Sequence, residues 1–190
     1  MPTKHIDIDL DSEDFILLLL EANERLLGKD AVSGITRLEK LLFLLKNETD
    51  FEGIARFFVF EPHNFGPFSK EVYEAVDFLE GCELIQVREK IYTSLYARSN
   101  EAKLSTEISD EDENIQATEK VFSLTENGRI VARKLREAIA AKRPQDIKAL
   151  DGIVLRYAGW PLNQLIRYVY RKYPEMTVKS VHPEAKRLLQ

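Results

Sequence analysis

The residues of this 190-residue chain that could ligate a metal ion or act as a nucleophile are three histidines and one cysteine. A zinc site on one helix needs His or Cys ligands a few residues apart, whereas His5, His63, Cys82 and His182 all lie far from one another. Cys82 follows a predicted helix end, not a helix N-terminus that would stabilise a thiolate. The sequence therefore predicts no metal site and no cofactor, and it assigns no role to Cys82.

Carboxylates are the remaining candidates for catalysis, and their densest group is the DEDE run at 110–113. This run lies in the stretch 99–118, which is rich in Ser, Asp, Glu and Asn and nearly free of large apolar residues. Such a composition is typical of an exposed acidic loop. The chain also has no GxSxG, Walker A or GxGxxG pattern. We therefore predict that the protein is not an enzyme and that it acts by binding.

The net charge of −5 conceals an uneven distribution along the chain. Residues 1–118 hold 12 basic and 25 acidic side chains, whereas residues 119–190 hold 15 basic and 7 acidic ones. Two interpretations fit this asymmetry. The two parts attract each other within one fold, or one surface meets a basic partner and another an acidic one.

Helical periodicity predicts two neighbouring helices at the start of the chain. The first runs from Asp11 or Ser12 to about Leu27 and is apolar almost all round, so we expect it to be buried on most sides. The second covers 36–48, is capped by Thr36, and follows a short polar loop. Its apolar stripe leaves charged residues that we expect to face water: Arg37, Glu39, Lys40 and Lys46.

A central segment, 57–81, leads from these helices to a third. It opens with the strand-favouring run 57–60 and continues through a loop that contains two prolines, a glycine and aromatic rings. Ser69 is expected to cap the third helix, and Gly81 is expected to end it as a C′ glycine. A stiff loop bearing apolar rings either fills its own core or contacts a partner.

Strand-favouring residues return at 84–96 and at 119–124, on either side of the acidic loop at 99–118. Thr125 is then expected to cap another helix. A helical unit followed by strand, loop and strand has the order of a winged helix with its β-wing. The predicted class is mainly α (α+β).

The chain is expected to divide into a winged-helix-like domain, 1–140, and a C-terminal helical extension, 141–190, that packs on it. In the extension, Pro144 and Pro161 fit the first turns of two helices, because proline is well tolerated there. A final short helix is expected at 182–190.

DNA binding is the alternative function, because winged helices often bind DNA. The third helix, however, carries one basic residue, Lys70, and four acidic ones that would repel phosphates: Glu71, Glu74, Asp77 and Glu80. Binding would instead use basic residues of the wing and of the following helix. The candidates are Arg88, Lys90, Arg98, Arg129, Arg133, Lys134 and Arg136.

Two segments resemble a known family. GITRLEKLLFLL is similar to the KLQKLLY-like helix of the Panacea domain, and FGPFSKEVYEAV is similar to its GPVxxEVY-like segment. The matching residues are Leu38, Lys40, Leu41, Leu42, Gly66, Pro67, Glu71, Val72 and Tyr73. The phrase FSLTENGRIVA also resembles the LTEKGR segment that follows the wing in winged-helix proteins.

The resemblance covers about residues 12–140. The chain departs from the pattern in the Asn-Phe before Gly66, where a Trp-x-Tyr phrase is typical, in the acidic insert, and in its last fifty residues. Family members include SocA-like antitoxins and YwgA-like proteins. The resemblance implies an antitoxin-like protein or an adaptor that binds a partner protein directly.

Aromatic and arginine side chains are enriched at protein interfaces, and several lie in the central loop and in the C-terminal extension. The residues that we predict to contact a partner protein, such as a toxin or the product of a neighbouring gene, are Phe65, Pro67, Phe68, Tyr73, Tyr168 and Arg171. The sequence leaves open a homodimer. It also leaves open a small-molecule sensor with a pocket between the central loop and the C-terminal helices.

The expected location is the cytoplasm. A single cysteine suits a reducing compartment. The most hydrophobic run, 15–20, has six residues and is too short to span a bilayer, so no membrane partner is predicted.

Overall fold

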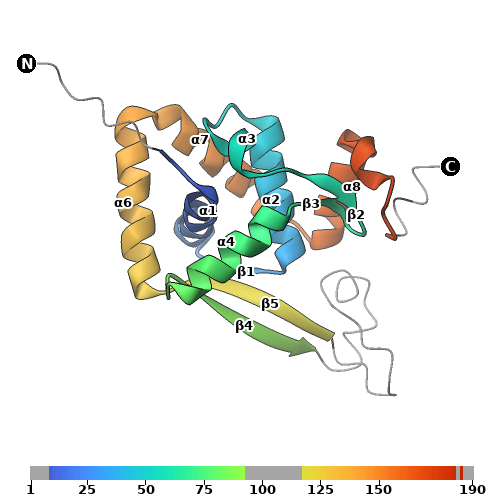
Figure 1. The fold of residues 1–190 in the computed structure, drawn as a ribbon, viewed down its shortest axis with the longest axis horizontal. Helices are drawn as coiled ribbons and strands as arrows, with labels where there is room; N and C mark the ends of the chain where they lie inside the picture. Colours follow the sequence, from blue (N-terminus) through green and yellow to red (C-terminus); the bar gives the residue numbers. More distant parts are fainter. Residues whose placement is uncertain (1–8, 93–116, 183–184, 186–190) are drawn as a thin grey trace, which may run out of the picture.

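The computed structural model describes residues 9–92, 117–182 and 185 (Figure 1). Helices dominate this part of the chain, and its strands form two small antiparallel sheets, which confirms the predicted mainly α (α+β) class. The elements, in order, are α1 (Ser12–Leu27), β1 (Ala31–Ser33), α2 (Ile35–Glu48), α3 (Ile54–Phe57), β2 (Glu61–His63), β3 (Gly66–Phe68), α4 (Lys70–Gly81), β4 (Ile85–Tyr92), β5 (Ala117–Leu124), α6 (Glu126–Lys142), α7 (Pro144–Ile153), the π-helical turn η2 (Val154–Ala158), α8 (Leu162–Lys172) and the 3-10 turn η3 (Pro174–Thr177).

Helix α1 is the centre of the core, as its apolar composition predicts. Every residue from Phe15 to Leu20 is buried, and the helix contacts α4, α6 and α7 as well as the sheet (Figure 1). Its ends are also where the sequence predicts them. Asp14 accepts a hydrogen bond from the backbone N–H of Asp11 at 3.1 Å, and Gly28 ends the helix in the left-handed conformation, with φ of 63°.

The main sheet has the strand order β1-β5-β4, and β4 and β5 form an antiparallel pair from the two stretches predicted to be strands. Val32 and Val87 both lie opposite Phe122, which is fully buried, so this side of the sheet covers the helices. The β1 strand was not expected, because the sequence analysis treats residues 28–35 as a polar loop. Its three residues become a strand by pairing with β5.

The central segment differs from the prediction. Residues 57–60 do not form a strand: Phe57 ends α3, and its ring packs with that of Phe58 around Phe15 in the core. The strands come later, as the two-stranded hairpin β2–β3, in which Pro62 lies opposite Pro67. Prolines fit this pair because alternate pairs of an antiparallel ladder exchange no backbone hydrogen bonds.

Three predicted helix ends also need correction. Ser69 lies at the N-cap position of α4, but its hydroxyl donates to the carboxylate of Glu71 and accepts no cap hydrogen bond. Gly34, with φ of 85°, precedes α2 at the N-cap position, so Thr36 lies inside the first turn and caps nothing. Gly81 is the last residue of α4, and the left-handed residue is Glu83, with φ of 56°. By contrast, Thr125 caps α6 as predicted and accepts a hydrogen bond from the N–H of Gly128 at 3.0 Å.

The C-terminal helices pack on the N-terminal ones. Helix α7 and η2 contact α1 and α2, and α8 contacts α2 and β3. Pro144 lies in the first turn of α7 as predicted, whereas Pro161 precedes the first turn of α8, at the N-cap position. Of the short helix predicted at 182–190, only His182 and Ala185 are within the described residues.

A close backbone contact joins the end of α4 to the start of α6, and it gives a test of the fold. A β-carbon on Gly128 would lie 1.9 Å from the carbonyl oxygen of Leu84, whereas one on Gly152 would meet nothing within 4 Å. We expect Gly128→Ala to lower the free energy of unfolding by about 3 kcal/mol or more. Gly152→Ala, the matched control in α7, is expected to raise it by about 0.5–1 kcal/mol. Urea denaturation measures both, and a Gly128→Ala variant as stable as the wild type would contradict the contact.

Candidate functional site

Helix α4 turns an acidic and aromatic surface to solvent. Its buried stripe is Val72, Ala75, Val76 and Leu79. The opposite side, which we call the α4 face, consists of Tyr73, Glu74, Asp77, Phe78 and Glu80. Phe78 is 58% exposed and Tyr73 is 39% exposed. Exposed large apolar rings bordered by polar side chains are typical of a surface that contacts another protein.

Aromatic rings of the β2–β3 hairpin extend the α4 face at its N-terminal end. The ring centroids of Phe68 and Tyr73 are 5.4 Å apart, and those of His63 and Phe68 are 4.9 Å apart. Phe68 and Tyr73 were both predicted to contact a partner, and the structure places them side by side. Phe78 was not among the residues predicted to contact a partner. A sequence signal for its exposure exists, because Phe78 lies off the apolar stripe of the helix.

A buried ion pair lies beneath the hairpin. Lys40 is only 1% exposed, and its Nζ atom donates a hydrogen bond to the carbonyl oxygen of Pro67 at 2.8 Å. The same Nζ lies 3.5 Å from a carboxylate oxygen of Glu39, whose other oxygen accepts a hydrogen bond from the N–H of Ser69 at 3.3 Å. Glu39 and Lys40 were predicted to face water. They are buried because the hairpin and the start of α4 cover this side of α2.

Burial affects the protonation equilibria of this pair in opposite directions. Burial raises the pKa of Glu39, although Lys40 and the N–H of Ser69 act against this, and burial lowers the pKa of Lys40 against the attraction of Glu39. Each charge therefore depends on the other. The pair holds the hairpin and the N-terminus of α4 on α2.

Two of the predicted partner-binding residues lie inward of the α4 face. Pro67 is buried, and its carbonyl oxygen accepts the bond from Lys40, so its role in the fold is to position the hairpin. Phe65 is half-buried and packs against the core. The adjacent Gly66 has φ of 95°, and a β-carbon there would lie 2.7 Å from the ring of Tyr170, so only glycine lets the hairpin approach α8 this closely.

Tyr168 belongs to a different group of side chains. The hydroxyl groups of Tyr157 and Tyr168 donate to the two carboxylate oxygens of Glu48 at 2.7 and 2.8 Å, and Lys172 donates to the same carboxylate at 2.8 Å. Trp160 packs against both tyrosine rings. These contacts join α2, η2 and α8. Arg171, the remaining predicted residue, is exposed on α8.

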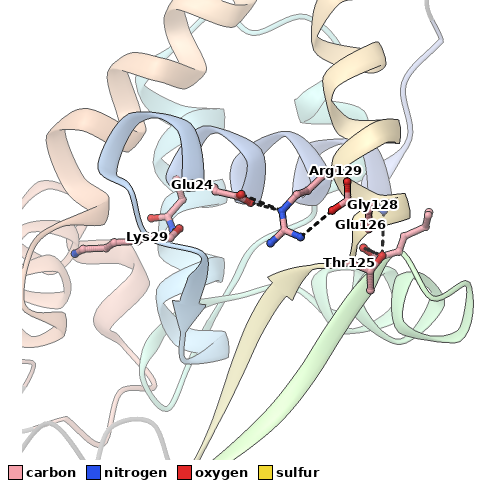
Figure 2. A network of polar contacts seen from close by, with 8 residues as sticks. Glu24, Lys29, Thr125, Glu126, Gly128 and Arg129 are labelled. Atoms are coloured by element: carbon pink, nitrogen blue, oxygen red, sulfur yellow. Dashed lines mark hydrogen bonds and ion pairs between the residues drawn. The ribbon is translucent and has the colours of Figure 1, made fainter.

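The basic residues proposed for DNA binding are dispersed, and several have acidic partners. Figure 2 shows Arg129 between α1 and α6, with its Nε atom 2.9 and 3.0 Å from the two carboxylate oxygens of Glu24. Arg136 lies 3.8 Å from Glu21, also on α1. In α6, Arg133 and Lys134 are exposed, as are Arg88 and Lys90 on β4. Arg98 lies outside the described residues.

These ion pairs bear on the charge asymmetry of the chain. Acidic residues of α1 pair with basic residues of α6, as Glu24 does with Arg129 and Glu21 with Arg136. The two oppositely charged parts of the chain therefore do attract each other within the fold. The α4 face is different in part: Glu74 pairs with Lys70, whereas within the described residues neither Asp77 nor Glu80 has an ion-pair partner.

Removal of the Lys40 charge tests the buried pair. We expect Lys40→Met to lower the free energy of unfolding by about 3–5 kcal/mol, because it leaves the Glu39 carboxylate buried without a cation. The double variant Glu39→Gln with Lys40→Met is expected to recover part of this loss. Lys70→Met, on the exposed side of α4, serves as a control and is expected to cause no measurable change. Urea denaturation followed by circular dichroism measures all three, and a Lys40→Met variant with wild-type stability would contradict the assignment.

The carboxylate of Glu48 gives a prediction of pH dependence. Burial alone would raise the pKa of Glu48, but hydrogen bonds from Lys172, Tyr157 and Tyr168 lower it below its ordinary value. Glu48→Gln is therefore expected to lower the free energy of unfolding by about 1–3 kcal/mol near neutral pH. Because the folded-state pKa is the lower one, this stabilisation is complete above the ordinary carboxylate pKa and is lost as the pH falls through the folded-state value. Denaturation of both proteins at neutral and acidic pH, with Glu175→Gln as control, tests this. If the difference in the free energy of unfolding between the wild type and Glu48→Gln does not decrease at acidic pH, the role assigned to the Glu48 carboxylate is contradicted.

Comparison with known proteins adds no relative: no family model matches the chain, and a search of curated proteins finds no match. Over the described ranges, no helix is long and apolar enough to cross a membrane. The same ranges contain no group of three or more His, Cys, Asp or Glu side chains placed to hold a metal ion. Within the site, the segments 34–45 and 65–76 contact each other through the hydrogen bond from Lys40 to Pro67.

Proposed function

We propose that this chain is a non-enzymatic winged-helix protein that regulates a partner protein by direct contact, as an antitoxin-like protein or an adaptor. The order of its elements supports the winged-helix assignment: α1, β1, α2 and α4 are followed by the β4–β5 hairpin, and β1 pairs with the far side of β5. The resemblance to the Panacea domain supports the same assignment, because its two segments meet in space.

The α4 face is the observation that carries the proposal. Helix α4 immediately precedes the hairpin, which is the position of the DNA-recognition helix in a winged-helix protein. Here that helix exposes Glu74, Asp77 and Glu80, which would repel phosphates. It also exposes Phe78, a large anchor of the kind that dominates binding energy in protein interfaces. The expected partner surface is basic and has an apolar recess for this ring.

DNA binding is supported less well. Arg129 and Arg136 are engaged by Glu24 and Glu21 on α1, so contact with phosphates would compete with these ion pairs. Arg133 and Lys134 are exposed but lie on α6, away from the helix that a winged-helix protein places in the major groove. We expect the protein to leave a random-sequence duplex unbound even at low salt.

The test is co-expression of the protein with the products of adjacent genes, followed by size-exclusion chromatography and calorimetric titration of any complex. Phe78→Ala is expected to weaken the complex by about 30-fold or more, because it removes the central anchor. Ile130→Ala is the matched control, since Ile130 is also an exposed apolar residue but lies on α6.

Two results would contradict the proposal. One is the absence of a complex with any adjacent gene product, or a complex that Phe78→Ala leaves unchanged. The other is tight binding of a fluorescent random-sequence duplex that weakens with salt and is lost in the double variant Arg133→Glu with Lys134→Glu. The second result would establish the DNA-binding alternative.

A further inference from the structure

An open groove of about 770 Å³ lies beside the end of the α4 face. Its floor includes Ala31, Gln86, Arg88, Val121 and Ser123, which alternate along their strands with the buried residues that face the helices. Its walls come from three turns: Asp30 before β1, Glu80 and Glu83 at the end of α4, and Glu126, Asn127 and Arg129 at the start of α6.

The walls of the groove carry a surplus of negative charge. Asp30, Glu80, Glu83 and Glu126 contribute four carboxylates. Of the two cations that line the groove, Arg129 is held by Glu24 and Glu126, as Figure 2 shows. Arg88 remains on the floor, where it donates a hydrogen bond to the side chain of Gln86 at 2.7 Å. An occupant with several positive charges fits this distribution.

The floor suits a chain in extended conformation. The side chains of Ala31 and Ser123 are short, so a second backbone can approach the sheet closely. Beside the groove, strand β4 lies at the edge of the sheet in the described part of the chain, with its second side unpaired (Figure 1). This edge offers backbone N–H and C=O groups to an added strand, which would lie next to the floor of the groove and not on it.

The groove is continuous with the α4 face, because Glu80 belongs to both. A partner whose basic surface covers Asp77 and Phe78 therefore also lies next to the acidic walls of the groove at the end of α4. We propose that this groove takes an extended segment of the partner protein that is rich in lysine or arginine. This inference rests on the function proposed above, and it adds the second surface and the type of segment that fills it.

A second copy of this chain is a poorer occupant. If two β4 strands paired with each other in antiparallel fashion about Arg88, the two Arg88 side chains would lie opposite each other. Pairing about Glu89 would place the two Glu89 side chains opposite each other, and Arg88 opposite Lys90. In each of these two pairings of β4 with β4, side chains of like charge would lie opposite each other. A foreign segment with the complementary charge has no such penalty.

The test is a titration of the full chain, labelled with nitrogen-15, with a synthetic peptide of alternating lysine and threonine. A peptide of alternating glutamate and threonine is the control ligand. The lysine peptide is expected to shift the amide resonances of Ala31, Gln86, Ser123 and Thr125, and its binding is expected to weaken as salt rises. The double variant Glu80→Gln with Glu83→Gln is expected to bind it about three- to tenfold more weakly. Glu137→Gln, an exposed carboxylate of α6 outside the groove, is the control variant and is expected to bind it normally.

The outcomes separate this inference from the proposed function. Shifts confined to the α4 face, or no shifts at all, would overturn the groove assignment, while the complex that depends on Phe78 would still stand. Equal binding of the glutamate peptide would overturn the charge preference. Shifts in the groove, combined with failure of every adjacent gene product to form a complex, would support the groove and reject the α4 face as a partner surface.

Discussion

The buried ammonium group of Lys40 determines how the candidate surface is built. It bonds to the hairpin through the carbonyl oxygen of Pro67 and lies beside Glu39, which in turn accepts from the N–H of Ser69 at the start of α4. Two charges removed from water are costly unless the geometry around them is well satisfied, so this region tolerates little displacement. This contact set positions the start of α4, the helix that exposes Phe78.

Charge is distributed in two distinct ways in the molecule. Between α1 and α6, carboxylates and guanidinium groups neutralise each other within the fold, as Glu24 and Arg129 do. Along the α4 face and the walls of the groove, carboxylates outnumber the cations that could neutralise them. Surface charges that are not paired within the fold act at longer range on other molecules. They accelerate association with molecules of opposite charge and disfavour partners of the same sign. Both surfaces therefore fit the basic partner that we propose.

The sequence predicts well those features whose causes are local. The ends of α1 and the cap of α6 depend on Asp14, Gly28 and Thr125, which act within a few residues. Features caused by distant contacts were missed. β1 forms only because β5 pairs with it. Residues 57–60 do not form the predicted strand, because the rings of Phe57 and Phe58 pack around Phe15. At the candidate site, the role of Phe68 and Tyr73 as partner contacts stays a prediction. The burial of Glu39 and Lys40 was not predicted, because helical periodicity places both on the polar side of α2.

Rigidity links the two surfaces. The N-terminal end of α4 is fixed by Glu39 and Ser69. Just past its C-terminal end, the carbonyl oxygen of Leu84 accepts a hydrogen bond from the N–H of Thr125 at 3.1 Å and lies against Gly128. A helix held at both ends keeps the α4 face and the groove at a constant distance and angle. A partner that spans both then binds a preformed surface, and little conformational entropy is lost on this side of the interface. Specificity would then depend on whether the anchor for Phe78 and the basic segment of the partner have the matching separation.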